Sequence, residues 1–362
     1  MTINRVKLDN FMIFDHLDIE FSPNINIVSG ENNTGKTAVI KLIYSLLKGY
    51  SEACLSKGDV TKEKIESKLV SKLQGVFRPD KDAVGRLVNR RQGSNHADIV
   101  LWFDDYSKTK IAFGNRQEKH LEIEGAFFDG LKSFESEYPQ PVYIPPKEII
   151  SATENFESLY ADYHIAFEET YYDLTRLLGR PLRKGPNTAE QKQVLKSFEQ
   201  IVNGSIIQRD RKFYLKVKGA GEFEMGLVSE GYRKIVTIMY LILSGSLSKN
   251  AVLFWDEPET NMNPKMIRPL VDAIIELARM GVQVFVTTHD YFVQQCFNMA
   301  ALYAEDNGKQ KSLNYNFLSL YKSENEIRCE QASNLSDLKH NPVMEEFDLL
   351  YDREQEMMYG SR

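Results

Sequence analysis

The segment Gly30-Glu31-Asn32-Asn33-Thr34-Gly35-Lys36-Thr37 matches the pattern G-x-x-x-x-G-K-[ST] at every fixed position. An apolar strand pattern at 25–28 precedes it, and apolar side chains at helical spacing follow it over 38–47. Backbone N–H groups of such a loop, together with the N-terminus of the helix, form a site for phosphate groups. The segment therefore predicts a nucleotide-binding loop, with candidate contacts at Gly30, Asn32, Asn33, Thr34, Gly35, Lys36 and Thr37.

Two side chains at the end of this loop carry its expected chemistry. Lys36 is predicted to reach the β- and γ-phosphates of ATP, and the Thr37 hydroxyl to ligate Mg²⁺. A chance glycine-rich loop is the alternative, but the strand before the segment and the helix after it argue against that alternative. ATP and Mg²⁺ are therefore the predicted ligands.

An acidic pair in the second half of the chain complements the loop. The apolar run Val252-Leu253-Phe254-Trp255 has the character of a buried strand, and Asp256-Glu257 follows it directly. Asp256 is predicted to bind Mg²⁺ through water, and Glu257 to act as general base toward the attacking water. Taken alone, an acidic pair after a strand is most often a helix cap. Its combination with the loop at 30–37 favours the catalytic interpretation.

Two more segments lie at informative distances from Asp256. Ser229-Glu230-Gly231 stands at a predicted helix start, and Gly231 precedes Asp256 by 25 residues. His289 follows an apolar strand pattern and stands 33 residues after Asp256. Each signal is weak by itself, since Ser-x-Gly is a common helix start and a histidine at a strand end is most often structural. Their order and spacing together are specific.

These segments resemble the ABC-type ATPase heads of the SMC, RecF and OLD families over residues 1–48 and 225–300. The resemblance implies an ATPase in which Ser229 and Gly231 bind the γ-phosphate held by the other subunit. It implies that His289 hydrogen-bonds the γ-phosphate and senses hydrolysis. Residues 261–264 would form the D-loop at the dimer interface. The implied partner is therefore a second copy of the chain, joined through an interface that encloses ATP.

The chain also departs from those families. Ser229-Glu230-Gly231-Tyr232 replaces the S-G-G-Q of ABC transporters, and Asn263 stands at the aspartate position of the D-loop. Residues 143–148 resemble the Q-loop region, yet Gln140 is the one nearby glutamine. The string Asp256-Glu257-Pro258-Glu259 is more similar to OLD-type and bacterial defence ATPases than to RecF.

The expected fold is an α/β P-loop NTPase head of ABC/SMC type, with a mixed sheet, short antiparallel N-terminal strands and a mainly helical insertion. We expect residues 1–50 and 205–310 to form the ATPase core. Residues 51–204 would be an inserted subdomain with a β-meander at 97–125, and 311–362 would add strands and an acidic helix. The expected helices include 154–178, 189–202, 230–243, 264–280 and 291–299.

Composition limits the cellular compartment in which this fold is expected. The 362 residues have a net charge of −6, no apolar run long enough for a membrane span, and no apolar N-terminal leader. The cysteines at 54, 296 and 329 are scattered, which excludes a disulfide framework and a zinc ribbon. We expect a cytoplasmic protein without membrane contact.

Charge is distributed unevenly along the chain. Residues 57–91 contain ten Lys/Arg and five Asp/Glu, and a later hairpin adds five cations, whereas the C-terminal tail is acidic. A solvated helix face is one interpretation of the basic run, and a DNA- or RNA-contacting surface is the other. The five hairpin cations are Arg209, Arg211, Lys212, Lys216 and Lys218.

The leading hypothesis is a homodimeric or higher oligomeric ATPase that regulates a separate effector. The chain is most similar to ATPase subunits of bacterial anti-phage systems of the Septu and retron-associated type, so the implied effector is an HNH nuclease or a retron component. Because 73 residues follow His289 in this sequence, we expect no appended Toprim nuclease. Two alternatives stay open: a RecF-like ATP-dependent DNA-binding repair protein, and a nuclease with a metal site in the middle region, for which Asp104-Asp105 is more typical of a hairpin turn.

Overall fold

The central sheet brings the ends of its parallel strands side by side. The computed structural model describes residues 2–90, 92–104, 107–124, 140–163, 165–303, 313–324 and 326–360. Within these ranges the sheet runs in the order β14 (Glu326–Ala332), β13 (Tyr315–Ser323), β3 (Ile25–Gly30), β12 (Gln283–Thr287), β11 (Val252–Asp256) and β7 (Pro141–Ile144). Neighbours pair in parallel from β13 to β7, while β14 is antiparallel to β13. Every residue of β3, β7, β11 and β12 is buried, as expected for strands covered on both faces.

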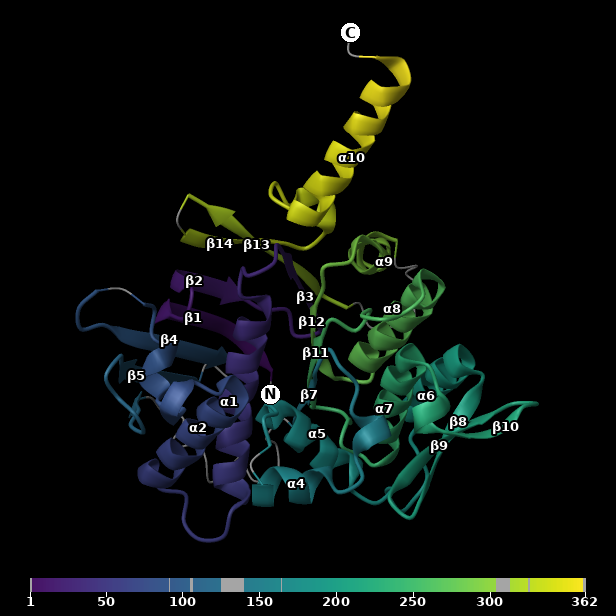
Figure 1. The fold of residues 1–362 in the computed structure, drawn as a ribbon, viewed down its shortest axis with the longest axis horizontal. Helices are drawn as coiled ribbons and strands as arrows, with labels where there is room; N and C mark the ends of the chain where they lie inside the picture. The colour runs from purple at the N-terminus through teal and green to yellow at the C-terminus, as the bar shows by residue number, and fades with distance from the viewer. Residues whose placement is uncertain are drawn as a thin grey trace.

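An antiparallel sheet and two helices cover one face of the central sheet. The strands of this antiparallel sheet run in the order β2 (Phe14–Glu20), β1 (Ile3–Phe11), β4 (His96–Phe103), β5 (Lys108–Gly114) and β6 (Glu122–Glu124). Helices α1 (Lys36–Leu55) and α2 (Lys62–Phe77) pack with this sheet and with Val28, Phe254 and Phe285 of the central one (Figure 1). Because β4 pairs with β1, the predicted meander extends the N-terminal sheet. The proposed division into domains stays a prediction.

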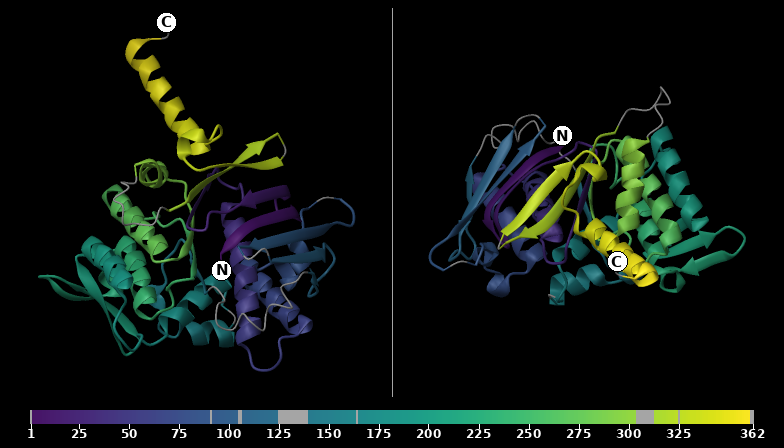
Figure 2. Two further views of the ribbon diagram at one scale, coloured as in Figure 1. Left: turned by 180° about the vertical axis from the view of Figure 1, so that it is seen from behind. Right: turned by 90° about the horizontal axis from the view of Figure 1, so that it is seen from above.

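Helices cover the other face of the central sheet and form a second core with it. This core contains Ile27, Leu253, Trp255 and Val284. The helices are α4 (Phe156–Tyr163), α5 (Glu169–Leu178), α6 (Ala189–Val202), α7 (Glu230–Leu243), α8 (Pro264–Arg279) and α9 (Tyr291–Leu302). A small sheet of β10 (Gly221–Glu224), β9 (Lys212–Val217) and β8 (Gly204–Arg209) extends away from α6 and α7 (Figures 1 and 2). Helices α6 and α7 have the bounds that the sequence predicts.

The C-terminal helix α10 (Pro342–Tyr359) projects from the body (Figures 1 and 2). None of its residues is buried, and Leu349, Tyr351 and Met358 are largely exposed. It is attached at its base, where the Asn341 side chain caps the helix and also donates to Gln294, and where the rings of Phe347 and Tyr291 pack together. Within the described ranges no helix combines the length and apolar character that crossing a bilayer needs.

The prediction of one long helix over 154–178 is wrong. The structure has two helices, because α4 ends at Tyr163 and α5 begins at Glu169. Glu168 has extended backbone before α5, and its carboxylate accepts 2.7 and 2.8 Å hydrogen bonds from Lys41 of α1. The aromatic stripe is partly internal to this pair of helices, since Tyr160 stacks on Tyr172 at 4.6 Å.

The basic run at 57–91 is not a uniformly solvated surface. Lys72 of α2 is 1% exposed, and its Nζ lies 2.6–3.0 Å from carboxylate oxygens of Glu52, Glu169 and Asp173. Burial alone would lower the pKa of Lys72, but the three carboxylates raise it above its ordinary value. Lys64 is also used internally, where it donates to four backbone carbonyls after α1. At least these two lysines therefore make contacts within the folded chain.

Replacing Lys72 by methionine is expected to destabilise the protein by about 3–5 kcal/mol, because buried carboxylates would lose their counter-ion. Urea unfolding followed by circular dichroism measures this loss. Lys62→Met, at an exposed position of the same helix, is the matched control and should change stability by about 0.5 kcal/mol or less. Equal stability of the two variants would contradict the structural role assigned to Lys72.

Candidate active site

Two glycines, one at the end of β3 and one directly before α1, are required because neighbouring atoms pack closely against them. Gly30 has φ +144°, and a Cβ there would lie 2.1 Å from the carbonyl oxygen of Leu320. Gly35, with φ +88°, would place a Cβ 2.4 Å from the ring of Phe14. Between them the Thr34 hydroxyl donates to the Glu31 carbonyl at 2.8 Å. The loop is therefore tightly packed at both glycines, and such a loop lets backbone N–H groups surround a phosphate.

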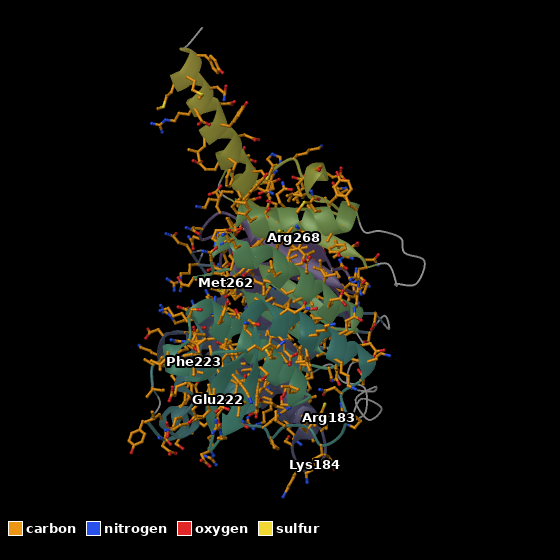
Figure 3. All side chains as sticks on the ribbon, turned by 90° about the vertical axis from the view of Figure 1, so that its right-hand side faces the viewer. Arg183, Lys184, Glu222, Phe223, Met262 and Arg268 are labelled. Atoms are coloured by element: carbon orange, nitrogen blue, oxygen red, sulfur yellow. The ribbon has the colours of Figure 1, made fainter. Side chains whose placement is uncertain are left out.

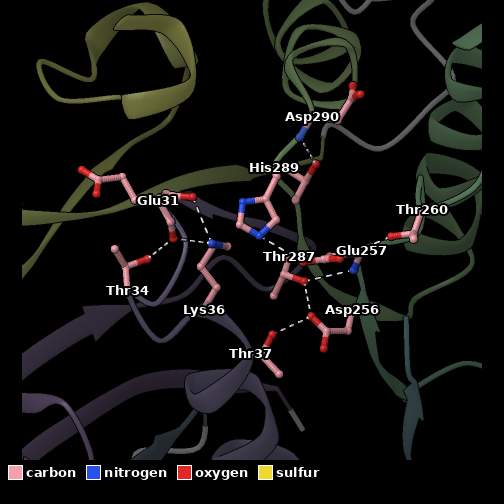
Figure 4. A network of polar contacts seen from close by, with 12 residues as sticks. Glu31, Thr34, Lys36, Thr37, Asp256, Glu257, Thr260, Thr287, His289 and Asp290 are labelled. Atoms are coloured by element: carbon pink, nitrogen blue, oxygen red, sulfur yellow. Dashed lines mark hydrogen bonds and ion pairs between the residues drawn. The ribbon is translucent and has the colours of Figure 1, made fainter. Parts of the chain in front are cut away.

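Lys36 begins α1 and folds back over the loop (Figure 4). Its Nζ donates to the carbonyls of Gly30 at 2.9 Å and Glu31 at 2.7 Å. Burial lowers the pKa of Lys36 to about 8, while Glu257 and Asp256 oppose that shift. An arriving phosphate would supply the anion that this buried ammonium lacks. Asn32 and Asn33 are exposed on the loop.

Asp256, the last residue of β11, is bound by three hydroxyls. Its Oδ1 accepts from Thr37 at 3.0 Å and from Thr287 at 2.5 Å, and its Oδ2 accepts from Tyr143 at 2.9 Å. Burial raises the pKa of Asp256, and these three hydrogen bonds oppose the rise. The carboxylate is therefore held in one orientation by three elements of the chain.

Glu257 and His289 form a pair beside Asp256 (Figure 4). His289 Nε2 lies 3.0 Å from Glu257 Oε1, and this hydrogen bond lowers the pKa of Glu257 against the effect of burial. Glu257 has φ +47°, a conformation that costs non-glycine residues free energy and is concentrated at functional sites. Its N–H is held by the carbonyl and hydroxyl oxygens of Thr287, at 3.2 and 3.1 Å.

The oxygen atoms of Thr37 and Asp256 fit a magnesium ion. A hydroxyl and a carboxylate are hard oxygen ligands of the kind that Mg²⁺ prefers, and they are already in contact. Elsewhere, among the residues that the structure describes, no group of three or more His, Cys, Asp or Glu side chains is placed to hold a metal. Asp104 lies in a turn, and Asp105 lies outside the described residues.

Ser229 and Gly231 lie at the start of α7. Ser229 is exposed and its hydroxyl does not cap the helix. Gly231 is buried against the segment after β11, where a Cβ would lie 3.1 Å from Met262 Cγ. Asn261 donates to Glu230 at 2.9 Å across the same contact. Figure 3 shows Met262 on the side of the molecule that also carries Glu222 and Phe223 of β10.

Sequence reasoning missed three side chains that build the site. Tyr143 and Thr287 bind Asp256, and Lys234 of α7 is buried with its Nζ 3.3 Å from the Glu257 carbonyl and 3.0 Å from that of Thr260. Thr287 could have been found from its place at the end of a predicted parallel strand. Tyr143 could not, because its role depends on β7 lying next to β11.

The fold and these contacts define a P-loop ATPase of the SMC/RecF type. The family described as "AAA domain, putative AbiEii toxin, Type IV TA system" matches residues 25–293, and the chain belongs to this family.

Similar proteins agree with this class. RecF of Halalkalibacterium halodurans is 50% identical over 46 residues, which are 13% of this chain and 12% of that protein. RecF of Enterobacter sp. is 31% identical over 100 residues, or 27% of each chain. Structural maintenance of chromosomes protein 6 of Dictyostelium discoideum is 30% identical over 97 residues, 25% of this chain and 8% of that one. The matches therefore span about a quarter or less of these relatives.

Solved structures match over almost the whole chain. An SMC head bound to the C-terminal winged-helix domain of ScpA aligns with a TM-score of 0.57 and 12% identity, covering 94% of this chain and all of that one. An SMC head with an extended coiled coil from Pyrococcus furiosus gives 0.53 and 10%, covering 98% and 99%. At this identity the likeness establishes the fold, and it confirms the predicted SMC-type α/β head.

Proposed function

We propose that this chain hydrolyses ATP and does so as a homodimer. The observation that carries the proposal is the meeting of Lys36, Thr37, Asp256, Glu257 and His289 at one edge of the central sheet. These side chains come from both ends of the matched family region. Their chemistry supplies a phosphate-binding cation, oxygen ligands for a metal, and a base.

Each residue has a separate task in this proposal. Lys36 would exchange its backbone carbonyl partners for the β- and γ-phosphates of ATP. Thr37 and Asp256 would hold Mg²⁺, which supplies positive charge to the phosphates when it is bound. Glu257 would accept the proton of the attacking water, and its lowered pKa keeps it ionised near neutral pH. His289 would orient that carboxylate and contact the γ-phosphate.

A cavity near the phosphate loop supports a binding site for the nucleobase of ATP. It has a volume of about 640 Å³, and one of its lining residues, Ile13, packs close to Gly35. Two arginines and an amide line it, groups that can stack on a purine or hydrogen-bond its edge. The lining residues are Met12, Ile13, Asp15, Arg86, Val88, Asn89 and Arg90.

The position of Ser229 and Gly231 supports a site completed by a second subunit. Both lie at the N-terminus of α7, where the helix dipole favours an anion, and Ser229 is exposed. We propose that they bind the γ-phosphate held by the loop of the other subunit, so that ATP is enclosed between two copies.

Mixing two inactive variants tests this arrangement. Lys36→Ala and Ser229→Arg should each abolish hydrolysis as a homodimer, because both composite sites lose a required group. A heterodimer of the two keeps one intact site, so an equimolar mixture should recover roughly a quarter of wild-type phosphate release if mixing is random. A mixture that stays as inactive as its components, while native mass spectrometry shows heterodimers, would contradict the shared site.

We propose further that the ATPase regulates a separate effector in bacterial anti-phage defence, such as an HNH nuclease or a retron component. The string Asp256-Glu257-Pro258-Glu259 and the toxin named in the family description support this. The described cysteines, at 54, 296 and 329, form no disulfide, which supports a reducing cytoplasm. Co-expression with the neighbouring gene product should give co-elution and fewer phage plaques, and Lys36→Ala should restore plaque numbers. Unchanged plating in all strains would contradict the defence role.

A RecF-like DNA-binding function is the second candidate, and the RecF matches favour it. Arg211, Lys212, Lys216 and Lys218 are exposed on or beside the β8–β9 hairpin. Binding of a fluorescent DNA duplex that requires ATP and weakens steeply with salt would support this candidate. Charge reversal of Lys216 and Lys218 should then reduce DNA binding without reducing ATP affinity.

The alternative of a nuclease in the middle region gains no support from the described residues.

A further inference from the structure

Glu259 is a buried carboxylate that the proposed chemistry leaves without a task. Its Oε1 accepts from the Thr288 hydroxyl at 2.6 Å and from the His289 N–H at 3.3 Å. Its Oε2 is buried without a hydrogen-bond partner in the part of the chain that the structure describes. Burial raises the pKa of Glu259 to about 7, against the hydrogen bonds from Thr288 and His289. Such a costly group calls for an explanation.

The two donors belong to the turn that carries His289. The Thr288 hydroxyl donates to Glu259 and also accepts the N–H of Asp290 at 3.0 Å, and Asp290 caps the N-terminus of α9. Glu259 therefore binds both the residue before His289 and the backbone of His289 itself. This places the turn at a fixed distance from the loop that contains Glu257.

The loop that contains Glu259 is also held by contacts with α7. Lys234 of α7 donates to the carbonyls of Glu257 and Thr260. Glu257 and His289 then meet at 3.0 Å. The loop after β11 is thus joined to α7 by Lys234 and to the turn after β12 by Glu259.

We propose that Glu259 is a positioning residue that holds the His289 turn so that its imidazole faces Glu257. The proposal rests on the proposed ATPase function, because it assigns the effect to the hydrolytic step. An acceptor oxygen at this place is sufficient for the role. Glutamine should therefore replace glutamate, whereas alanine should not.

The test compares Glu259→Ala, Glu259→Gln and Thr288→Val with the wild-type chain. Glu259→Ala should lower kcat by between ~10- and ~100-fold with KM for ATP changed by no more than about twofold, because a misdirected pair affects the reaction more than binding. Glu259→Gln should stay within about threefold of wild type, and Thr288→Val should fall between them. Glu276→Ala, which removes a carboxylate paired with Arg279 on α8, is the control and should leave kcat unchanged.

A second readout does not need turnover. The imidazole C–H resonances of His289, assigned by their loss in His289→Asn, should shift in Glu259→Ala and Thr288→Val but stay near wild type in Glu259→Gln. Should wild type lack ATPase activity, the proposed function fails while the resonances still test the positioning role. Unshifted resonances in Glu259→Ala, or equal losses of kcat for the Ala and Gln variants, would overturn the proposal. Melting temperatures identify any variant that does not fold, and Thr288→Val then carries the test.

Discussion

Lys36→Ala is expected to weaken ATP binding by at least ~100-fold. The ammonium is buried in the loop and already makes two hydrogen bonds to carbonyls that a phosphate would outcompete. Hydrogen bonds to charged groups are worth about 1.5–3 kcal/mol each, and the variant loses the bonds to two phosphates. Isothermal titration calorimetry with Mg²⁺ and ATP measures the change.

The matched control for this variant is Lys41→Ala on the same helix. Lys41 pairs with Glu168 instead of facing the loop, so its removal should change ATP affinity by no more than about threefold. Circular dichroism establishes that both variants fold. Unchanged affinity in Lys36→Ala would mean that the loop does not bind phosphate.

Glu257→Gln should slow hydrolysis by ~100- to ~10,000-fold while ATP binding persists, because the amide cannot accept the proton of the attacking water. The proposed metal ligands Thr37 and Asp256 are untouched, so a dimer enclosing ATP should accumulate. Phosphate release and light scattering after size-exclusion chromatography measure the two effects.

Glu31→Gln is the control for this second variant. Glu31 is exposed on the phosphate loop, and its amide form should leave turnover and oligomeric state close to wild type. Glu257→Gln that remains a monomer with ATP would contradict the enclosed dimer. Hydrolysis at the wild-type rate would show that another group acts as the base.

The parts of the site carried by local patterns could be predicted from the sequence. The loop at 30–37 and the pair Asp256-Glu257 each combine a strand pattern with a fixed set of residue types, and the structure brings Thr37 and Asp256 to 3.0 Å. Tyr143 and Lys234 could not be found this way, because their contacts depend on which strands and helices become neighbours.

One omission and one error in the sequence analysis have physical causes. One face of α2 carries Ile65, Leu69, Lys72 and Val76. Helical spacing therefore already placed Lys72 among apolar residues, but the summed charge of the run at 57–91 gave no sign of this. The aromatic spacing over 154–178 continues through the break before α5, because Phe156 and Phe167 still pack together at 5.3 Å. Periodicity therefore reported the buried face correctly and the continuity of the helix incorrectly.

The projecting helix α10 has a consequence for how this protein can change over generations. Neither core contains a buried side chain from that helix, and its capping residue Asn341 lies before it. Shortening the helix from its outer end would therefore remove no buried side chain from either core. Substitutions along the outer part of the helix meet no packed core, whereas the loop glycines leave no room for a side chain.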